Sequence, residues 1–169
     1  MNKKEMKKIT NPFEPVYNKH SKILILGTIA SPKSREYGFF YGHPQNSFWR
    51  VLANIFNIFL PESIDDKKYF LLSNKIALWD VLYSCEITGA DDNSIKNPIV
   101  NNFSVILNNS EIKHILTTGK TATKLYDKHC FKDTHIPAVY LPSTSPANRK
   151  YYNFDKLCEE YKIIKKLLT

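Results

Sequence analysis

The sequence predicts an α/β fold in which helices cover both faces of a parallel sheet, and two observations predict it. First, four short apolar runs have the length and composition of buried strands: 23–26, 76–79, 114–117 and 138–141. Second, the stretches between and after these runs carry apolar residues at helical spacing. Strands that alternate with helices form right-handed βαβ crossovers, so the four strands are expected to run parallel.

Four stretches have the periodicity of an amphipathic helix. Apolar side chains recur every three or four residues in 48–56, 99–107, 122–126 and 156–168, and the last stretch predicts one closing helix. With 169 residues, of which 43% are hydrophobic, the chain is long enough for one domain with a substantial core. We therefore expect a basic, extended N-terminal arm over 1–20 and a single domain over 21–169.

Charge and cysteine content limit the classes of partner and cofactor. The net charge of +8 favours an anionic partner only weakly, because the surplus of lysine is concentrated near the two ends of the chain. The three cysteines form no CxxC pair, so we expect no metal, no disulfide framework and a cytoplasmic protein. Since no apolar run approaches the length of a membrane span, and no apolar repeat stands out, we expect no membrane partner and a monomer.

Ligands of a parallel sheet bind outside the carboxyl ends of its strands, so the segments that follow the predicted strands should build any active site. One of them, Gly119–Lys120–Thr121, predicts a phosphate site at a helix N-terminus, although a plain glycine turn explains it equally well. It is not a complete P-loop, because His114 stands where the first glycine is required. Asp80 is a candidate acid, base or base-edge contact, or simply a turn aspartate, whereas Asp91 and Asp92 predict a hydrated loop.

The stretch GFFYGHPQNSFW, residues 38–49, is the most unusual part of the sequence. Exposed aromatic rings stack on nucleic-acid bases, and glycines allow a backbone to approach a ligand closely. Phe48 and Trp49 begin the apolar face of the next predicted helix and are expected in the core. Tyr41 and its neighbours remain as candidate base-stacking rings, while Asn46 is either a functional amide or the N-cap of the helix.

Four segments together resemble one protein family. Segments 27–35, 38–49, 77–82 and 142–148 are similar to the hypoxanthine-DNA glycosylases, also called DNA-deoxyinosine glycosylases, within the uracil-DNA glycosylase superfamily. The resemblance implies a three-layer α/β/α sandwich with a central four-stranded parallel sheet. It also implies a monofunctional enzyme of base excision repair that needs no cofactor. Such an enzyme flips a deaminated base out of double-stranded DNA and hydrolyses its N-glycosidic bond.

The resemblance also assigns site residues. It implies that Asn46 is catalytic and that Tyr41 stacks on the flipped base. Asp80 remains a candidate base-edge contact or an alternative catalytic base. The other candidate base-binding residues are Phe40, Thr28, Ile29, Ala30 and His43. The candidate DNA-binding residues are Ser31, Lys33, Ser34, Arg35, Gly119, Lys120, Thr121, Ser143, Thr144, Ser145, Pro146, Ala147 and Asn148.

Two departures from the superfamily pattern keep alternatives open. Segment 27–31 has neither the asparagine nor the aspartate that usually positions the attacking water, and Leu141 and Pro142 stand where other branches have a histidine or asparagine. An amide cannot deprotonate water at neutral pH, so Asn46 is expected only to orient it. A uracil- or mismatch-specific glycosylase, an inactive lesion-binding module and a nucleotide-handling enzyme are the alternative functions.

Overall fold

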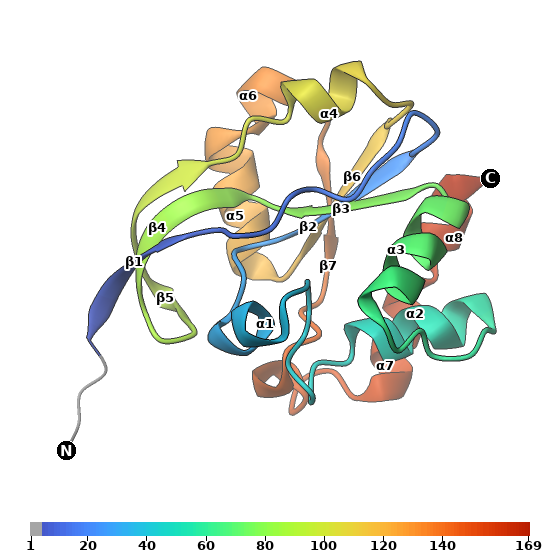
Figure 1. Ribbon diagram of the computed structural model, residues 1–169, viewed down its shortest axis with the longest axis horizontal. Helices are drawn as coiled ribbons and strands as arrows, with labels where there is room; N and C mark the ends of the chain where they lie inside the picture. Colours follow the sequence, from blue (N-terminus) through green and yellow to red (C-terminus); the bar gives the residue numbers. More distant parts are fainter. Residues whose placement is uncertain (1–4) are drawn as a thin grey trace.

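The computed structural model describes residues 5–169 and contains the predicted parallel sheet (Figure 1). Its four strands are β2 (Ile23–Gly27), β3 (Ile76–Asp80), β6 (His114–Thr118) and β7 (Ala138–Leu141). They lie in the order β3-β2-β6-β7 and all run parallel. The predicted α/β class and the four-stranded sheet are therefore confirmed.

Helices cover both faces of this sheet (Figure 1). Alternate residues of β2 point to opposite faces, so Ile23 and Ile25 belong to one core and Leu24 and Leu26 to the other. The helices of the first face are α2 (Phe48–Phe56), α3 (Ile64–Ser73), α7 (Phe154–Tyr161) and α8 (Ile163–Leu168). Those of the second face are α4 (Ser104–Asn108) and α5 (Lys120–His129), and the shorter elements are α1 (Pro32–Tyr37), α6 (Phe131–Thr134) and the 3₁₀ turn Pro146–Asn148.

A second, antiparallel sheet was not predicted. It contains β1 (Met6–Thr10), β4 (Leu82–Thr88) and β5 (Asp91–Val100) in the order β1-β4-β5. β5 is polar and mostly exposed, and it pairs with β4 through several register shifts, so its extended conformation depends on its partner. The predicted helix over 99–107 is therefore wrong in its first half, because only α4 is helical.

The segment expected as an N-terminal arm is built into both sheets. β1 pairs with β4 along its whole length, and Val16 forms an antiparallel bridge with Leu78 of β3. The described part of the segment is largely extended and ends in a turn at 19–20, and its backbone adds hydrogen bonds to both sheets. Residues 1–4 lie outside the described residues.

The C-terminal residues form two short helices, so the prediction of one closing helix over 156–168 is wrong. α7 ends at Tyr161 and α8 begins at Ile163. Both helices still bury the predicted apolar positions, including Leu157, Tyr161 and Ile164. Across residues 5–169, no helix has the length and apolar character needed to cross a membrane.

Tyr161 supports the loop that follows β7. Its hydroxyl is buried and donates a hydrogen bond of 2.6 Å to the carbonyl oxygen of Pro142. Within the loop, the side-chain amide of Asn148 donates to the carbonyl oxygen of Ser143, and the Ser145 N–H donates to the Ser143 hydroxyl. The backbone of loop 142–148 is therefore held by the core below it and by its own polar side chains.

Replacing Tyr161 by phenylalanine tests this support. Tyr161→Phe leaves the buried carbonyl of Pro142 without its donor, so the free energy of unfolding is expected to fall by about 1–2 kcal/mol. Urea denaturation measures the change. Tyr151→Phe is the matched control, because Tyr151 is solvent-exposed and should tolerate the loss of its hydroxyl. Equal losses in the two variants would contradict the assignment.

Candidate active site

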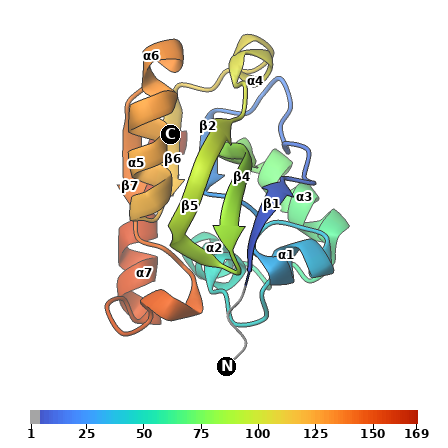
Figure 2. The same ribbon diagram turned by 90° about the vertical axis from the view of Figure 1, so that its left-hand side faces the viewer.

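A cavity of about 380 Å³ opens at the carboxyl ends of the parallel strands. It is bounded by the segment after β2, the aromatic loop before α2, the end of β3, the β4–β5 turn and loop 142–148. Figure 2 shows the β4–β5 turn lying between α1 and the loop that precedes α7. The lining residues are Gly27, Thr28, Ile29, Ala30, Ser31, Ser34, Phe40, Tyr41, His43, Asn46, Asp80, Ala90, Asp92, Thr118, Ser143, Thr144, Ser145, Pro146 and Ala147.

The orientation of the Asn46 amide is set by its neighbours. Its Oδ1 accepts hydrogen bonds from the backbone N–H of Phe48, at 2.9 Å, and from the Thr144 hydroxyl, at 2.8 Å. An N–H can only donate, so the oxygen must face Phe48, and these two bonds use both lone pairs of a carbonyl oxygen. Asn46 therefore offers the cavity its Nδ2 hydrogens, which are donors.

Tyr41 stands between the aromatic core and the cavity. Its ring stacks on Phe48 with 3.8 Å between the ring centres and 13° between the planes, so one face of the ring is already covered. Its hydroxyl lies 2.8 Å from the Thr118 hydroxyl. Burial, followed by the negative charge of Asp80, raises the pKa of the Tyr41 hydroxyl far above its ordinary value, so the phenol stays neutral.

Asp80, at the end of β3, is buried at the closed end of the cavity. Asp80 is the register partner of Gly27 on β2, and its carboxyl occupies the space that a side chain at position 27 would need. A Cβ at position 27 would lie 2.7 Å from Asp80 Oδ1 and 3.1 Å from the Tyr41 hydroxyl. Burial raises the pKa of the Asp80 carboxyl to about 6, an increase that Asp92 adds to and that a hydrogen bond from Asn11 reduces.

Asp92 is the cavity carboxylate that the sequence analysis missed. Asp91 and Asp92 are solvent-exposed, as expected, but the expectation of a loop is wrong, because both residues begin β5 and Asp92 lines the cavity. The pKa of the Asp92 carboxyl is raised by partial burial and by Asp91, and it is lowered by a hydrogen bond with the side chain of Thr28. Only the antiparallel pairing of β4 with β5 brings Asp92 to this position, and no local sequence pattern indicates it. Gly27, Ala90 and Thr118 also line the cavity and were not among the predicted site residues.

The remaining predicted site residues divide into two groups. Thr28, Ile29, Ala30, Phe40 and His43 line the cavity together with Ser31, Ser34 and residues 143–147. Phe40 is 2% exposed and packs mainly in the aromatic core. The predicted residues that do not line the cavity are Lys33, Arg35, Gly119, Lys120, Thr121 and Asn148.

Several residues outside the cavity wall have identifiable local roles. The Arg35 guanidinium donates to the carbonyl oxygen of Ala30 and so supports the segment after β2. Lys33 is exposed on α1, beside Glu36. Gly119 precedes α5 in a left-handed conformation (φ 95°), and its N–H donates to the carbonyl oxygen of Leu141. The predicted arrangement is present: β6 ends at Thr118, Gly119 forms the turn and α5 begins at Lys120, whose side chain is exposed.

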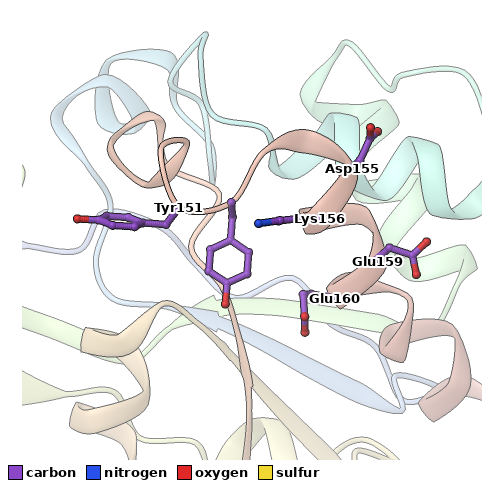
Figure 3. Close-up of a pocket in the computed structure, with 6 residues that line it drawn as sticks. Tyr151, Asp155, Lys156, Glu159 and Glu160 are labelled. Carbon is purple, nitrogen blue, oxygen red and sulfur yellow. The ribbon is translucent and has the colours of Figure 1, made fainter.

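A second hollow lies beside α7 (Figure 3). It is lined by Tyr151, Tyr152, Asp155, Lys156, Glu159 and Glu160, and it shares no residue with the cavity described above. Its three carboxylates oppose the binding of a phosphate backbone. Within residues 5–169, no cluster of three or more histidine, cysteine, aspartate or glutamate side chains has the arrangement of a metal site.

The comparisons with known proteins agree with this architecture. The family model described as the uracil DNA glycosylase superfamily matches residues 14–169. A relative from Methanosarcina barkeri, named hypoxanthine DNA glycosylase, is 36% identical over 140 residues, which cover 82% of this chain and 87% of the relative. A second relative with the same name, from Methanosarcina acetivorans, is 30% identical over 145 residues, or 85% of this chain and 90% of the relative.

A solved structure resembles the chain over nearly its whole length. A solution NMR structure from Methanosarcina acetivorans, provisionally described as a uracil DNA glycosylase, matches with a TM-score of 0.77 and 26% identity. The match covers 92% of this chain and 98% of that one. The fold and the cavity define an α/β protein with a candidate active site at the carboxyl edge of its parallel sheet. The chain belongs to the uracil DNA glycosylase superfamily.

The raised pKa of Asp80 predicts a pH-dependent cost in stability. Because the folded-state value of about 6 lies above the ordinary value of 3.8, folding disfavours the ionised form, and stability is lost as the pH rises through this interval. Asp80→Asn is expected to raise the free energy of unfolding by about 2 kcal/mol at pH 8 and by much less at pH 4. Urea denaturation at the two pH values measures this, with the exposed Asp127→Asn as control. An equal gain at both values would refute the interpretation.

Proposed function

We propose that the protein is a monofunctional DNA glycosylase that removes hypoxanthine from deoxyinosine in double-stranded DNA. The observation that carries the proposal is the convergence of the Asn46 amide and the carboxyl groups of Asp80 and Asp92 on one cavity at the carboxyl edge of the sheet. The names of the two Methanosarcina relatives support hypoxanthine as the base. Such a base must leave the helical stack to enter the cavity, and a weakly paired base costs least to extrude.

The reaction requires stabilisation of charge on both sides of the broken bond. The base leaves with the bonding electron pair, and the deoxyribose becomes cation-like at C1′. Water then adds its oxygen to C1′ and gives up a proton to the solvent, and the departed base anion takes up one proton, so that the products are an abasic site and free hypoxanthine. A donor close to the base and a carboxylate close to the sugar therefore serve this chemistry.

Asn46 is suited to be the donor. Both lone pairs of its Oδ1 are already used by Phe48 and Thr144, so Nδ2 is the part of the amide available to a ligand. We infer that Asn46 donates a hydrogen bond to the departing base, whereas the sequence suggested that it orients water. A hydrogen-bond donor that meets charge developing on the leaving group lowers the barrier to bond cleavage.

Asp92 is suited to position the water. It is exposed on the β4–β5 side of the cavity and interacts with Thr28, which belongs to the segment that lacks the superfamily's usual asparagine or aspartate. A carboxylate at this point accepts hydrogen bonds from water and favours a cation-like sugar. Asp80 is buried deeper, where the base edge would lie. We assign Asp92, from a distant part of the sequence, the role of the missing residue.

Incubation with a duplex that contains one deoxyinosine tests the proposed function. Alkali breaks the strand wherever an abasic site forms, so cleavage at the deoxyinosine is the expected result. Parallel duplexes with deoxyuridine, deoxyxanthosine or mispaired thymine measure the preference among bases. DNA binding without cleavage of any of these duplexes would refute the proposal and favour a lesion-binding module.

Asn46→Ala removes the proposed donor. The single-turnover excision rate on deoxyinosine is expected to fall at least about 100-fold, which is typical for the loss of one preorganised donor. Duplex affinity, measured by fluorescence anisotropy, should change little. Asn54→Ala on the exposed face of α2 is the matched control. Near-normal turnover by Asn46→Ala would contradict the assignment.

Asp92→Asn removes the proposed water-positioning charge. The single-turnover rate is expected to fall at least about tenfold at pH 7.5. Asp91→Asn makes the same change of charge at the adjacent exposed position and should retain most of the activity, because Asp91 does not line the cavity. Equal losses in the two variants would point to a general electrostatic effect on DNA binding and would count against the role.

A further inference from the structure

Asn11, in the N-terminal segment, holds the cavity carboxyl of Asp80. Its side-chain Nδ2 donates a hydrogen bond of 2.8 Å to Asp80 Oδ2 and one of 3.3 Å to the carbonyl oxygen of Leu82. Asn11 lies directly after β1, and its backbone N–H donates to the carbonyl oxygen of Tyr83. The residue precedes the part of the chain that the superfamily model matches, which begins at residue 14.

The orientation of the Asn11 amide is not free. Its Oδ1 accepts a hydrogen bond of 3.1 Å from the backbone N–H of Phe13. A backbone N–H cannot accept, so the oxygen of Asn11 must face Phe13 and both Nδ2 hydrogens must face Asp80 and Leu82. Asn11 therefore presents only donors to Asp80.

One oxygen of Asp80 remains for a ligand. Oδ2 is occupied by Asn11, whereas Oδ1 lies beside the bare backbone of Gly27, in the cavity wall. The titratable groups that face this carboxyl are the neutral Tyr41 hydroxyl and the Asp92 carboxyl, and the Thr118 hydroxyl lies next to Tyr41. Ionised Asp80 thus offers the ligand an acceptor at a fixed place.

Deamination changes the hydrogen-bonding edge of a base in a way that this acceptor can detect. When adenine becomes hypoxanthine, or cytosine becomes uracil, an unprotonated ring nitrogen becomes a ring N–H. A carboxylate oxygen accepts a hydrogen bond from the ring N–H, but its lone pairs repel those of the unprotonated ring nitrogen. The same oxygen therefore attracts the deaminated base and rejects its parent.

We propose that the Asn11–Asp80 pair selects bases that carry a proton on the ring nitrogen of the pairing edge, and so separates hypoxanthine from adenine and uracil from cytosine. Asp80 contacts the base, and Asn11 is a positioning residue that keeps Oδ1 turned to the cavity as an acceptor. The inference rests on the proposed glycosylase function. Guanine and thymine also carry such a proton, so the Asn11–Asp80 pair does not discriminate against them. Other contacts in the cavity and their stable pairing in DNA must exclude these two bases.

Asp80→Asn tests the direction of the selecting hydrogen bond. Because the Asn11 donors are fixed, the oxygen of the new amide must face Asn11 and its NH₂ group must face the cavity. Single-turnover excision of deoxyinosine is expected to fall at least about 100-fold, since the base N–H then meets a donor. The preference for deoxyinosine over a mispaired deoxyadenosine should narrow at least about tenfold, and an unchanged preference would overturn the proposal.

Asn11→Ala tests the positioning role through the pH profile. Without its donor, Asp80 should ionise at higher pH, so the acidic limb of kcat/KM on deoxyinosine should move from near pH 6 upward by about one pH unit. Activity lost at pH 6.5 should return in part at pH 8.5. Asn54→Ala is the control, and thermal unfolding establishes that both variants are folded.

The outcomes separate the two proposals. A wild-type protein that leaves deoxyinosine intact would refute the glycosylase function itself. An active wild type whose Asn11→Ala variant loses activity equally at every pH would refute the positioning role, because a purely structural defect does not move the acidic limb.

Discussion

The close approach of β2 and β3 at their carboxyl ends is the constraint on which the site depends. Gly27 leaves room for the Asp80 carboxyl and the Tyr41 hydroxyl beside its backbone, where a methyl group would collide with Asp80 Oδ1 and lie in tight contact with the Tyr41 hydroxyl. Thr118 at the end of β6 joins the same group through its bond to Tyr41. The ends of three neighbouring strands, β3, β2 and β6, thereby form one polar wall of the cavity, and the ring of Tyr41 packs against the aromatic core through Phe48.

The walls of the cavity are coupled to one another through the Asn46 amide. Thr144 in loop 142–148 donates its hydroxyl to Asn46, and the backbone N–H of Ser47 donates to the carbonyl oxygen of Thr144. Loop 142–148 is tied in turn to the closing helices by Tyr161. The loop predicted to contact DNA is therefore connected by direct hydrogen bonds to the amide proposed to stabilise the leaving base. Movement of either loop would misalign the donor.

The buried carboxyl group in the cavity lowers the stability of the fold at neutral and high pH. Two carboxyl groups, Asp80 and Asp92, line one cavity, and the negative charge of Asp92 raises the pKa of the Asp80 carboxyl. Burial is the larger cost for Asp80, and the hydrogen bond from Asn11 offsets part of it. A neutral residue at position 80 would favour folding at high pH but would remove the acceptor proposed to contact the base, so the proposed function accounts for a buried carboxyl at this position.

The sequence by itself determined the parallel sheet, the helix after the aromatic stretch and the edge at which the site lies, because apolar periodicity is a local signal. It also determined that Phe48 and Trp49 are core residues, and it indicated the segments around Tyr41, Asn46 and Asp80, which line the cavity. The tertiary structure alone decided the small antiparallel sheet, whose polar strand β5 is extended only because β4 pairs with it. The pairing of β5 with β4 brings Asp92 to the cavity, and the pairing of β1 with β4 places Asn11 beside Asp80. Hydrogen bonds from backbone groups set which atoms of Asn11 and Asn46 face their partners, and a linear sequence carries no record of such directions.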